Sequence, residues 1–274
     1  MLIVAIILGT LVAGIGSVWL AAALSFGMLA RYTQHMLSLA AGALLATAFM
    51  HLLPEAFESQ ASARDLFATL LVGLVFFFLL DKAELWHHGH EHSHGHGHVG
   101  DHAKGLSHGH FPDDLHVHQA DNGSKSGGWA VLAGDSVHCF GDGILIASAF
   151  MADMRLGIVA ALAVLAHEVP HHMGDLIVLR QSSSNQRAAF IKVSLAGAVT
   201  ALGGVLGYLL VDQLYDYLPY FLILASSSFI YVALADLIPQ LQKRAALRET
   251  AEQVAWLLAG IGLVTLISSF AHAH

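Results

Sequence analysis

Apolar stretches long enough to cross a lipid bilayer recur along this chain, and they constrain its fold more than any other feature. A bilayer core requires roughly 20 mostly apolar residues per helix. Hydrophobic residues make up 56% of the 274 residues and charged residues only 12%, well below the share that a soluble surface needs. We therefore predict an all-α integral membrane protein with eight transmembrane helices, over 2–24, 34–53, 66–80, 129–151, 156–179, 188–211, 218–239 and 254–270.

The Lys and Arg residues predict how these helices are oriented. Eight spans place successive loops on alternate sides of the membrane, and ten of the 12 Lys and Arg residues then fall on one side. Because cytoplasmic loops are enriched in positive charge, we expect both termini outside and the long loop 81–128 in the cytoplasm. The first span lacks the basic n-region of a signal peptide, and no targeting signal is recognised, so we expect a bacterial inner membrane.

Composition also excludes several partners and chemistries. The net charge is −8 and the cations are scattered, which argues against nucleic acid as a partner. The single Cys excludes a disulfide within the chain and a zinc ribbon built from cysteines. His, Asp and Glu remain as the residues that carry the chemistry. The oligomeric state is left open, and a homodimer is compatible with the sequence.

The loop 81–128 contains 12 of the 20 histidines. Its Gly, Ser, Asp and His content predicts disorder, and alternate imidazoles on a flexible chain can wrap a divalent ion in many ways. An expression tag is a poor explanation, because the tract is internal and irregular. We predict metal capture by the core of the tract, His87, His88, His90, His92, His94, His96 and His98.

A short internal repeat suggests the plan of the bundle. MHLLPE at 50–55 ends the second span and resembles ADLIPQ at 235–240, which ends the seventh. These two spans run in opposite directions, so equivalent positions lie at opposite membrane faces, as in the inverted repeats of secondary transporters. We predict two halves, 1–80 and 188–274, with 129–187 between them.

Ionisable residues interrupt the fourth and fifth spans, as DSVHCFGDG at 135–143 and HEVPHHMGD at 167–175. Each charged group at a helix centre costs about 2.5–3.5 kcal/mol on insertion scales, so such residues are functional candidates. Neither span contains Lys or Arg, and a bound cation would neutralise the carboxylates instead. The alternative is that these residues only join the helices through hydrogen bonds.

Helical spacing brings four of these side chains together. His138 and Asp142 share one face of the fourth span, and His167 and His171 share one face of the fifth. Because the two spans are antiparallel neighbours, the four side chains should meet at matching depths, about 12 to 20 Å into the membrane. Three imidazoles and one carboxylate suit Zn²⁺ and its first-row neighbours.

Further residues predict a second metal position and an ion path. Cys139, Glu168 and His172 lie at similar depth beside the first group, where a second divalent metal would find a more mixed ligand set. Residues nearer the two membrane faces are predicted to line the path: His51 and Glu55 at the outer face, and Asp135, Asp175 and Asp236 toward the cytoplasm.

HCFGDG at 138–143, HEVPHHMGD at 167–175, HLLPEA at 51–56 and the His-rich loop together resemble the ZIP family of divalent metal transporters. The resemblance covers all eight spans and implies a three-plus-two-plus-three bundle that moves ions toward the cytoplasm. It also implies a primary site of His138, Asp142, His167 and His171, flanked by Cys139 and Glu168. The family usually has Asn in place of Cys139 and Glu in place of His172, so the metal preference of the second position is open.

The resulting prediction is a secondary transporter, not an enzyme, whose partners are the lipid bilayer and its substrate ions. We expect Zn²⁺ as the main substrate, with Fe²⁺, Mn²⁺ or Cd²⁺ as further ones. One alternative is an intramembrane zinc metalloprotease, since His167-Glu168-x-x-His171 matches the H-E-x-x-H motif. Pro170 within that motif argues against it. Another is a six-span cation-efflux carrier with a His-rich loop.

Overall fold

The computed structural model describes residues 1–25, 33–89, 124–182, 186–241 and 247–272, and these residues form helices without any strand. Four α-helices and two π-helical segments build the first two spans, whereas α5, α6, α7, α8 and α11 are continuous helices of 26 to 29 residues. The elements are α1 (Leu2–Leu11), η1 (Val12–Gly16), α2 (Ser17–Ser25), α3 (Thr33–Thr47), η3 (Ala48–Leu52), α4 (Leu53–Phe57), α5 (Ala63–Gly89), α6 (Ser124–Ala152), α7 (Met154–Ser182), α8 (Gln186–Gln213), η5 (Tyr215–Tyr217), α9 (Leu218–Tyr231), η6 (Val232–Leu237), α10 (Ile238–Leu241) and α11 (Leu247–His272).

Seven helical segments of the described chain are long and apolar enough to cross a membrane, and they coincide with seven of the eight predicted spans. They are Leu2–Leu24, Gln34–Phe57, Ala63–Leu80, Met154–Gly174, Arg187–Gln213, Tyr215–Ala235 and Leu247–Ser269. The predicted fourth span lies in α6, whose apolar run is interrupted by Asp135, His138 and Asp142. An integral membrane protein is thus confirmed, whereas the count of eight stays a prediction.

The long loop departs from expectation at its two ends. Helix α5 continues to Gly89 and α6 begins at Ser124, so the prediction of disorder over 81–128 is wrong for its first and last residues. His87 and His88 belong to the last turn of α5, and their side chains lie outside the described structure. The remaining predicted metal-capture histidines fall within 90–123, which is also outside the described residues.

The internal repeat corresponds to a repeated local structure. In both copies a π-helix ends two residues before a proline: η3 precedes Pro54, and η6 precedes Pro239. A proline lacks the backbone N–H and collides with the carbonyl four residues earlier, so the preceding turn widens. The same proline effect therefore accounts for the π-helical segment in both copies of the repeat.

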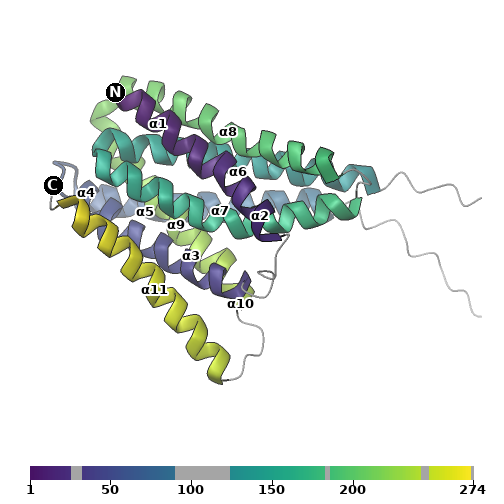
Figure 1. Cartoon of the computed structure of the whole chain (residues 1–274). Coiled ribbons are helices and arrows are strands. Elements are labelled where there is room, and N and C mark those ends of the chain that lie inside the picture. Colours follow the sequence, from purple (N-terminus) through teal and green to yellow (C-terminus); the bar gives the residue numbers. More distant parts are fainter. Residues whose placement is uncertain (26–32, 90–123, 183–185, 242–246, 273–274) are drawn as a thin grey trace, which may run out of the picture.

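Contacts between helices follow a reciprocal pattern. Helix α3 packs on α11 as α9 packs on α5, and η3 contacts α9 as η6 contacts α3. The N-terminal end of α1 and the C-terminal end of α11 lie at one end of the bundle, while α6 starts at the opposite end (Figure 1). The predicted topology requires both termini on the same side of the membrane, and this arrangement agrees with it.

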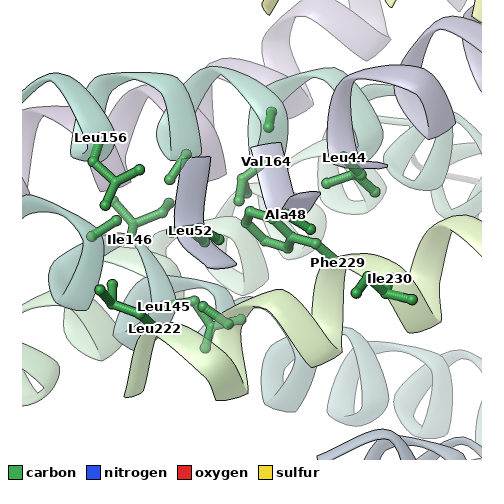
Figure 2. Close-up of a cluster of buried hydrophobic side chains, with 14 of the residues drawn as sticks. Leu44, Ala48, Leu52, Leu145, Ile146, Leu156, Val164, Leu222, Phe229 and Ile230 are labelled. Carbon is green, nitrogen blue, oxygen red and sulfur yellow. The ribbon is translucent and has the colours of Figure 1, made fainter. Parts of the chain in front are cut away.

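The apolar core lies between α3 with η3, α6, α7 and α9. Figure 2 shows Phe229 of α9 beside Ala48, with Leu44, Ile146 and Val164 contributed by the neighbouring helices. In contrast, α5 and α11 lie at the periphery and expose most of their apolar side chains, as expected of helices that face lipid. The buried core therefore supports α6 and α7, the two helices that carry the ionisable residues.

Small residues let the peripheral helix α11 approach α3 closely. A Cβ atom on Gly260 would lie 2.1 Å from the carbonyl oxygen of Leu39, whereas a Cβ on Gly262 would meet no atom within 4 Å. Backbone approach of this kind is typical of helix pairs in membranes. The two glycines thus form a matched pair, one in the interface and one outside it.

We expect Gly260→Ala to lower the thermal unfolding midpoint of the detergent-solubilised protein, because overpacking costs about 1–3 kcal/mol. Gly262→Ala should leave the midpoint unchanged or raise it, since alanine favours the helix by about 1 kcal/mol over glycine. Equal midpoints for the two variants would contradict the close α3–α11 packing.

Candidate metal centre

Helices α6 and α7 are consecutive and antiparallel, and a cap fixes the turn between them. The Asp153 carboxylate accepts hydrogen bonds from the backbone N–H groups of Arg155, at 2.8 Å, and Leu156, at 3.3 Å. This is an N-cap, which sets where α7 begins. Because the turn is short, the register of α7 against α6 follows from it, and polar residues of the two helices face each other.

The first group of candidate ligands comprises His138, Asp142, His167 and Glu168, and one ligand atom from each lies within 4.8 Å of the others. His167 Nε2 is 3.3 Å from Asp142 Oδ2 and 3.2 Å from Glu168 Oε1. His138 Nε2 is also 3.2 Å from that Glu168 oxygen. Four ligand atoms therefore converge on one point between the helices.

A second group lies one step along the same interface and comprises Asp135, Cys139, Glu168 and His172, all of them buried. His172 Nε2 is 3.1 Å from Glu168 Oε2 and 3.6 Å from Asp135 Oδ1. The Cys139 sulfur lies 3.7 Å from each of these two carboxylate oxygens. This set combines a thiol, an imidazole and two carboxylates.

Glu168 connects the two groups. Its Oε1 faces His138 and His167, and its Oε2 faces Cys139 and His172. The side chain is 1% exposed, so each oxygen is held within the protein interior. A carboxylate with this geometry can bridge two cations or transfer one cation between neighbouring positions.

A bound cation would stabilise the charged groups of the centre. Asp135 Oδ2 is buried without a hydrogen-bond partner, and the described ion-pair partners of Asp135, Asp142 and Glu168 are all imidazoles, which compensate a carboxylate only when they are protonated. A buried carboxylate without compensation is strongly unfavourable. Neutral imidazoles, carboxylates and a thiol together are the ligands that zinc and its neighbours prefer. The residues therefore fit a divalent transition metal ion.

A family profile described as ZIP Zinc transporter matches residues 1–268. The chain belongs to the ZIP zinc transporter family. Zinc transporter ZIP13 of Danio rerio is 28% identical over 268 residues, which cover 86% of this chain and 76% of that relative. Zinc transporter foi of Drosophila melanogaster is 29% identical over 164 residues, and zinc transporter ZIP4 of Homo sapiens is 33% identical over 136 residues.

Coverage differs among these ZIP relatives. The matched part is 60% of this chain and 23% of foi, and it is 50% of this chain and 20% of ZIP4. The chain thus spans about a fifth of the length of these two relatives. Members of the ZIP family are transporters, not enzymes.

Family membership leaves the protease interpretation without support, and the geometry of this ZIP chain agrees. A metalloprotease motif requires both histidines of H-E-x-x-H on one zinc ion. Here His167 belongs to the first group, whereas the His171 side chain is 38% exposed and belongs to neither described group. His171 Nδ1 instead lies 3.7 Å from Asp135 Oδ1, and its ring stacks on His138 at 5.6 Å.

Two of the predicted pairings between the helices occur as contacts, but the grouping of the residues differs from the prediction. Asp142 meets His167, and Cys139 meets Glu168, as the depth comparison requires. Glu168, expected only in the second position, contacts both groups. Asp135, expected on the exit path, lies within the second group.

His51 and Glu55 belong to neither described group. His51 is in η3, and Glu55 is in α4, where it interacts electrostatically with Asp153 at the α6–α7 turn. The side chains of Asp175 and Asp236 are outside the described structure. The roles of all these residues as ligands or path residues stay predictions.

Sequence reasoning missed Ser17, whose Oγ lies 2.9 Å from His172 Nδ1. A serine within an apolar first span carries no signal that separates it from a packing residue. Asp135 was recognisable as part of the second group, because it precedes Cys139 by four residues and so shares its helix face.

We expect Zn²⁺ to raise the thermal unfolding midpoint of the purified protein, because binding to the native state stabilises it by about 2.7 kcal/mol at a concentration of 100 Kd. Glu168→Ala removes a ligand from both groups and should abolish most of this shift. Asp142→Ala should retain part of it, and Asp212→Ala, at an exposed carboxylate, should retain all. These variants are best compared after deletion of 90–118, which removes 10 of the 12 loop histidines.

A Glu168→Ala variant that keeps the full zinc-induced shift would contradict the convergence of both groups on this carboxylate.

Proposed function

We propose that this protein is a secondary transporter that moves divalent transition metal ions into the cytoplasm through the site between α6 and α7. Zn²⁺ is the proposed main substrate, with Fe²⁺, Mn²⁺ and Cd²⁺ as further substrates. The observation that carries the proposal is the buried set of carboxylates and imidazoles without a neighbouring Lys or Arg among the described residues. Such a set favours a divalent cation that is bound and released, and the relatives foi, ZIP4 and ZIP13 are named as zinc transporters.

Two ion positions are part of the proposal. The first uses His138, Asp142, His167 and Glu168, and the second uses Asp135, Cys139, Glu168 and His172. Because Glu168 is common to both, an ion can move from one position to the other without losing all its protein ligands. This continuity lowers the cost of dehydrating the ion inside the membrane.

His171 retains its proposed role as a ligand, at the edge of the centre. Its exposed ring contacts His138, which belongs to the first ion position, and Asp135, which belongs to the second. An ion that enters or leaves either position can exchange a water ligand for this imidazole. The role is therefore transfer rather than permanent coordination.

The proposed entrance is the end of the bundle that carries His51 and Glu55. Glu55 interacts electrostatically with Glu58 and Asp153, and all three carboxylates are exposed. An acidic mouth raises the local concentration of divalent cations. The proposed exit runs past the second position toward Asp175 and Asp236.

The proposed topology places both termini outside and the His-rich loop in the cytoplasm, where His87, His88, His90, His92, His94, His96 and His98 capture metal. The common end of α1 and α11 supports the first part. Alternating access would come from inverted repeat halves, and the reciprocal contacts of α3 and α9 support such a repeat. The bacterial inner membrane and a homodimer stay predictions.

We expect His138→Ala and His171→Ala to abolish Zn²⁺ uptake into proteoliposomes that contain only this protein. His138→Ala removes a ligand of the first position, which weakens metal binding there, and His171→Ala removes the imidazole proposed to transfer the ion into and out of the centre. His35→Ala is the control, because His35 stacks on Trp256, and uptake should persist. Retained uptake in both ligand variants would refute the site assignment.

Deletion of residues 87–118 should leave the maximal uptake rate largely intact, because the proposed transport ligands lie on α6 and α7. The same proteoliposome assay checks this, with a panel of divalent ions at buffered free concentrations. Loss of all flux on deletion would assign transport to the loop. Cleavage of a membrane peptide without any ion flux would favour the protease instead.

A further inference from the structure

His172 is the residue of the second position whose orientation can be derived from its partners. Its side chain is fully buried, and its two ring nitrogens face different surroundings. Nδ1 faces Ser17 of the first span, while Nε2 faces Glu168 and Asp135. The state of Nδ1 therefore decides whether Nε2 is available to a metal ion.

The hydrogen bonds of Ser17 determine that state. The Ser17 hydroxyl donates to the carbonyl oxygen of Gly14, which can only accept. A serine hydroxyl has one proton, so toward His172 it must accept, and Nδ1 must carry the hydrogen at 2.9 Å. In the neutral ring, Nε2 then presents its lone pair to the second group.

This arrangement needs a positive charge between Nε2 and the carboxylates, either a proton on Nε2 or a metal ion. The Nε2 lone pair lies 3.1 Å from Glu168 Oε2 and 3.6 Å from Asp135 Oδ1, and neither ionised carboxylate can donate a proton to it. Asp135 Oδ2 is buried and has no hydrogen-bond partner. Acceptors that face one another across such distances repel unless a positive ion lies between them, and the Cys139 sulfur, 3.9 Å from Nε2, faces the same space.

Close packing holds Ser17 at this distance. It follows the π-helical segment η1, in which a Cβ on Gly14 would lie 2.0 Å from the carbonyl oxygen of Gly197 on α8. The first span is therefore pressed against α8, and Ser17 is fully buried where the span meets α7. A side chain from outside the metal-bearing helices thus reaches the centre.

We propose that Ser17 is a positioning residue that holds His172 with Nε2 directed at Asp135, Cys139 and Glu168, so that this position binds a thiophilic divalent ion such as Cd²⁺ or Zn²⁺. The inference rests on the proposed function, because it treats the second group as part of the ion path. A histidine ligand normally donates its other ring N–H to such a partner, and loss of the partner weakens metal binding about 10- to 100-fold.

The test uses the only cysteine of the chain as a reporter. Cd²⁺ is titrated into the purified full-length protein at chelator-buffered free concentrations, and the ultraviolet charge-transfer absorption of a thiolate bound to Cd²⁺ is recorded. Imidazoles of the His-rich loop do not give this absorption, so the signal reports Cys139 alone. Cys139→Ser should abolish it.

Two independent comparisons isolate the Ser17 hydroxyl. Ser17→Ala should shift the Cd²⁺ midpoint about 10- to 100-fold upward, whereas Ser38→Ala should not shift it. Ser38 is an equally buried serine whose hydroxyl, among the described residues, donates to the Gln34 carbonyl of its own helix. The Ser17→Thr variant should bind Cd²⁺ as the wild type does. The Ser17→Val variant, whose side chain has the shape of threonine without the hydroxyl, should bind Cd²⁺ as weakly as Ser17→Ala.

Equal midpoints for wild type, Ser17→Ala and Ser17→Val would overturn the inference, as would a wild type without the charge-transfer band. A purely structural role would lower the thermal unfolding midpoint and leave the Cd²⁺ midpoint in place, which also overturns it. Zn²⁺ flux is measured separately in proteoliposomes. Absent flux with an intact Ser17 effect refutes only the transport proposal, and normal flux without the Ser17 effect refutes only this inference.

Discussion

Three buried carboxylates require a compensating positive charge, and the metal centre of this structure depends on that requirement. Asp135, Asp142 and Glu168 lie between α6 and α7, where their described neighbours are imidazoles and a thiol. In a low-dielectric interior such groups are tolerated only when a cation or proton compensates them. The two helices therefore form a site that is electrostatically complete when a positive ion occupies it, and a transported divalent ion satisfies this condition.

The surrounding helices maintain this site through small residues. On α6, a Cβ on Gly143 would lie 2.1 Å from the Thr200 carbonyl oxygen of α8, and a Cβ on Gly14 of the first span would lie 2.6 Å from the Thr200 hydroxyl. Two helices thus converge on one point of α8. This convergence brings Ser17 to His172 and couples the first span to the metal centre. The outer helices α5 and α11 contribute little to the site and face lipid.

The sequence predicts the parts of this structure that follow from periodicity. Apolar windows locate the spans, and i,i+4 spacing with antiparallel depth brings Asp142 to His167 and Cys139 to Glu168. It does not predict which neighbouring residue turns inward when several imidazoles follow one another. His171 and His172 are adjacent, yet His172 is fully buried and His171 is exposed, a difference that depends on the rotation of α7 against its neighbours. Ser17 depends on packing between distant helices, which no local pattern encodes.

Crystals grown with Zn²⁺ allow the most direct test of the central claim, because anomalous scattering at the zinc absorption edge locates bound zinc. We expect anomalous peaks beside Glu168, within coordination distance of His138 and His167 or of Cys139 and His172. Glu168→Ala crystals grown under the same conditions should lack these peaks. Zinc found in the wild type only outside the α6–α7 interface would contradict this claim.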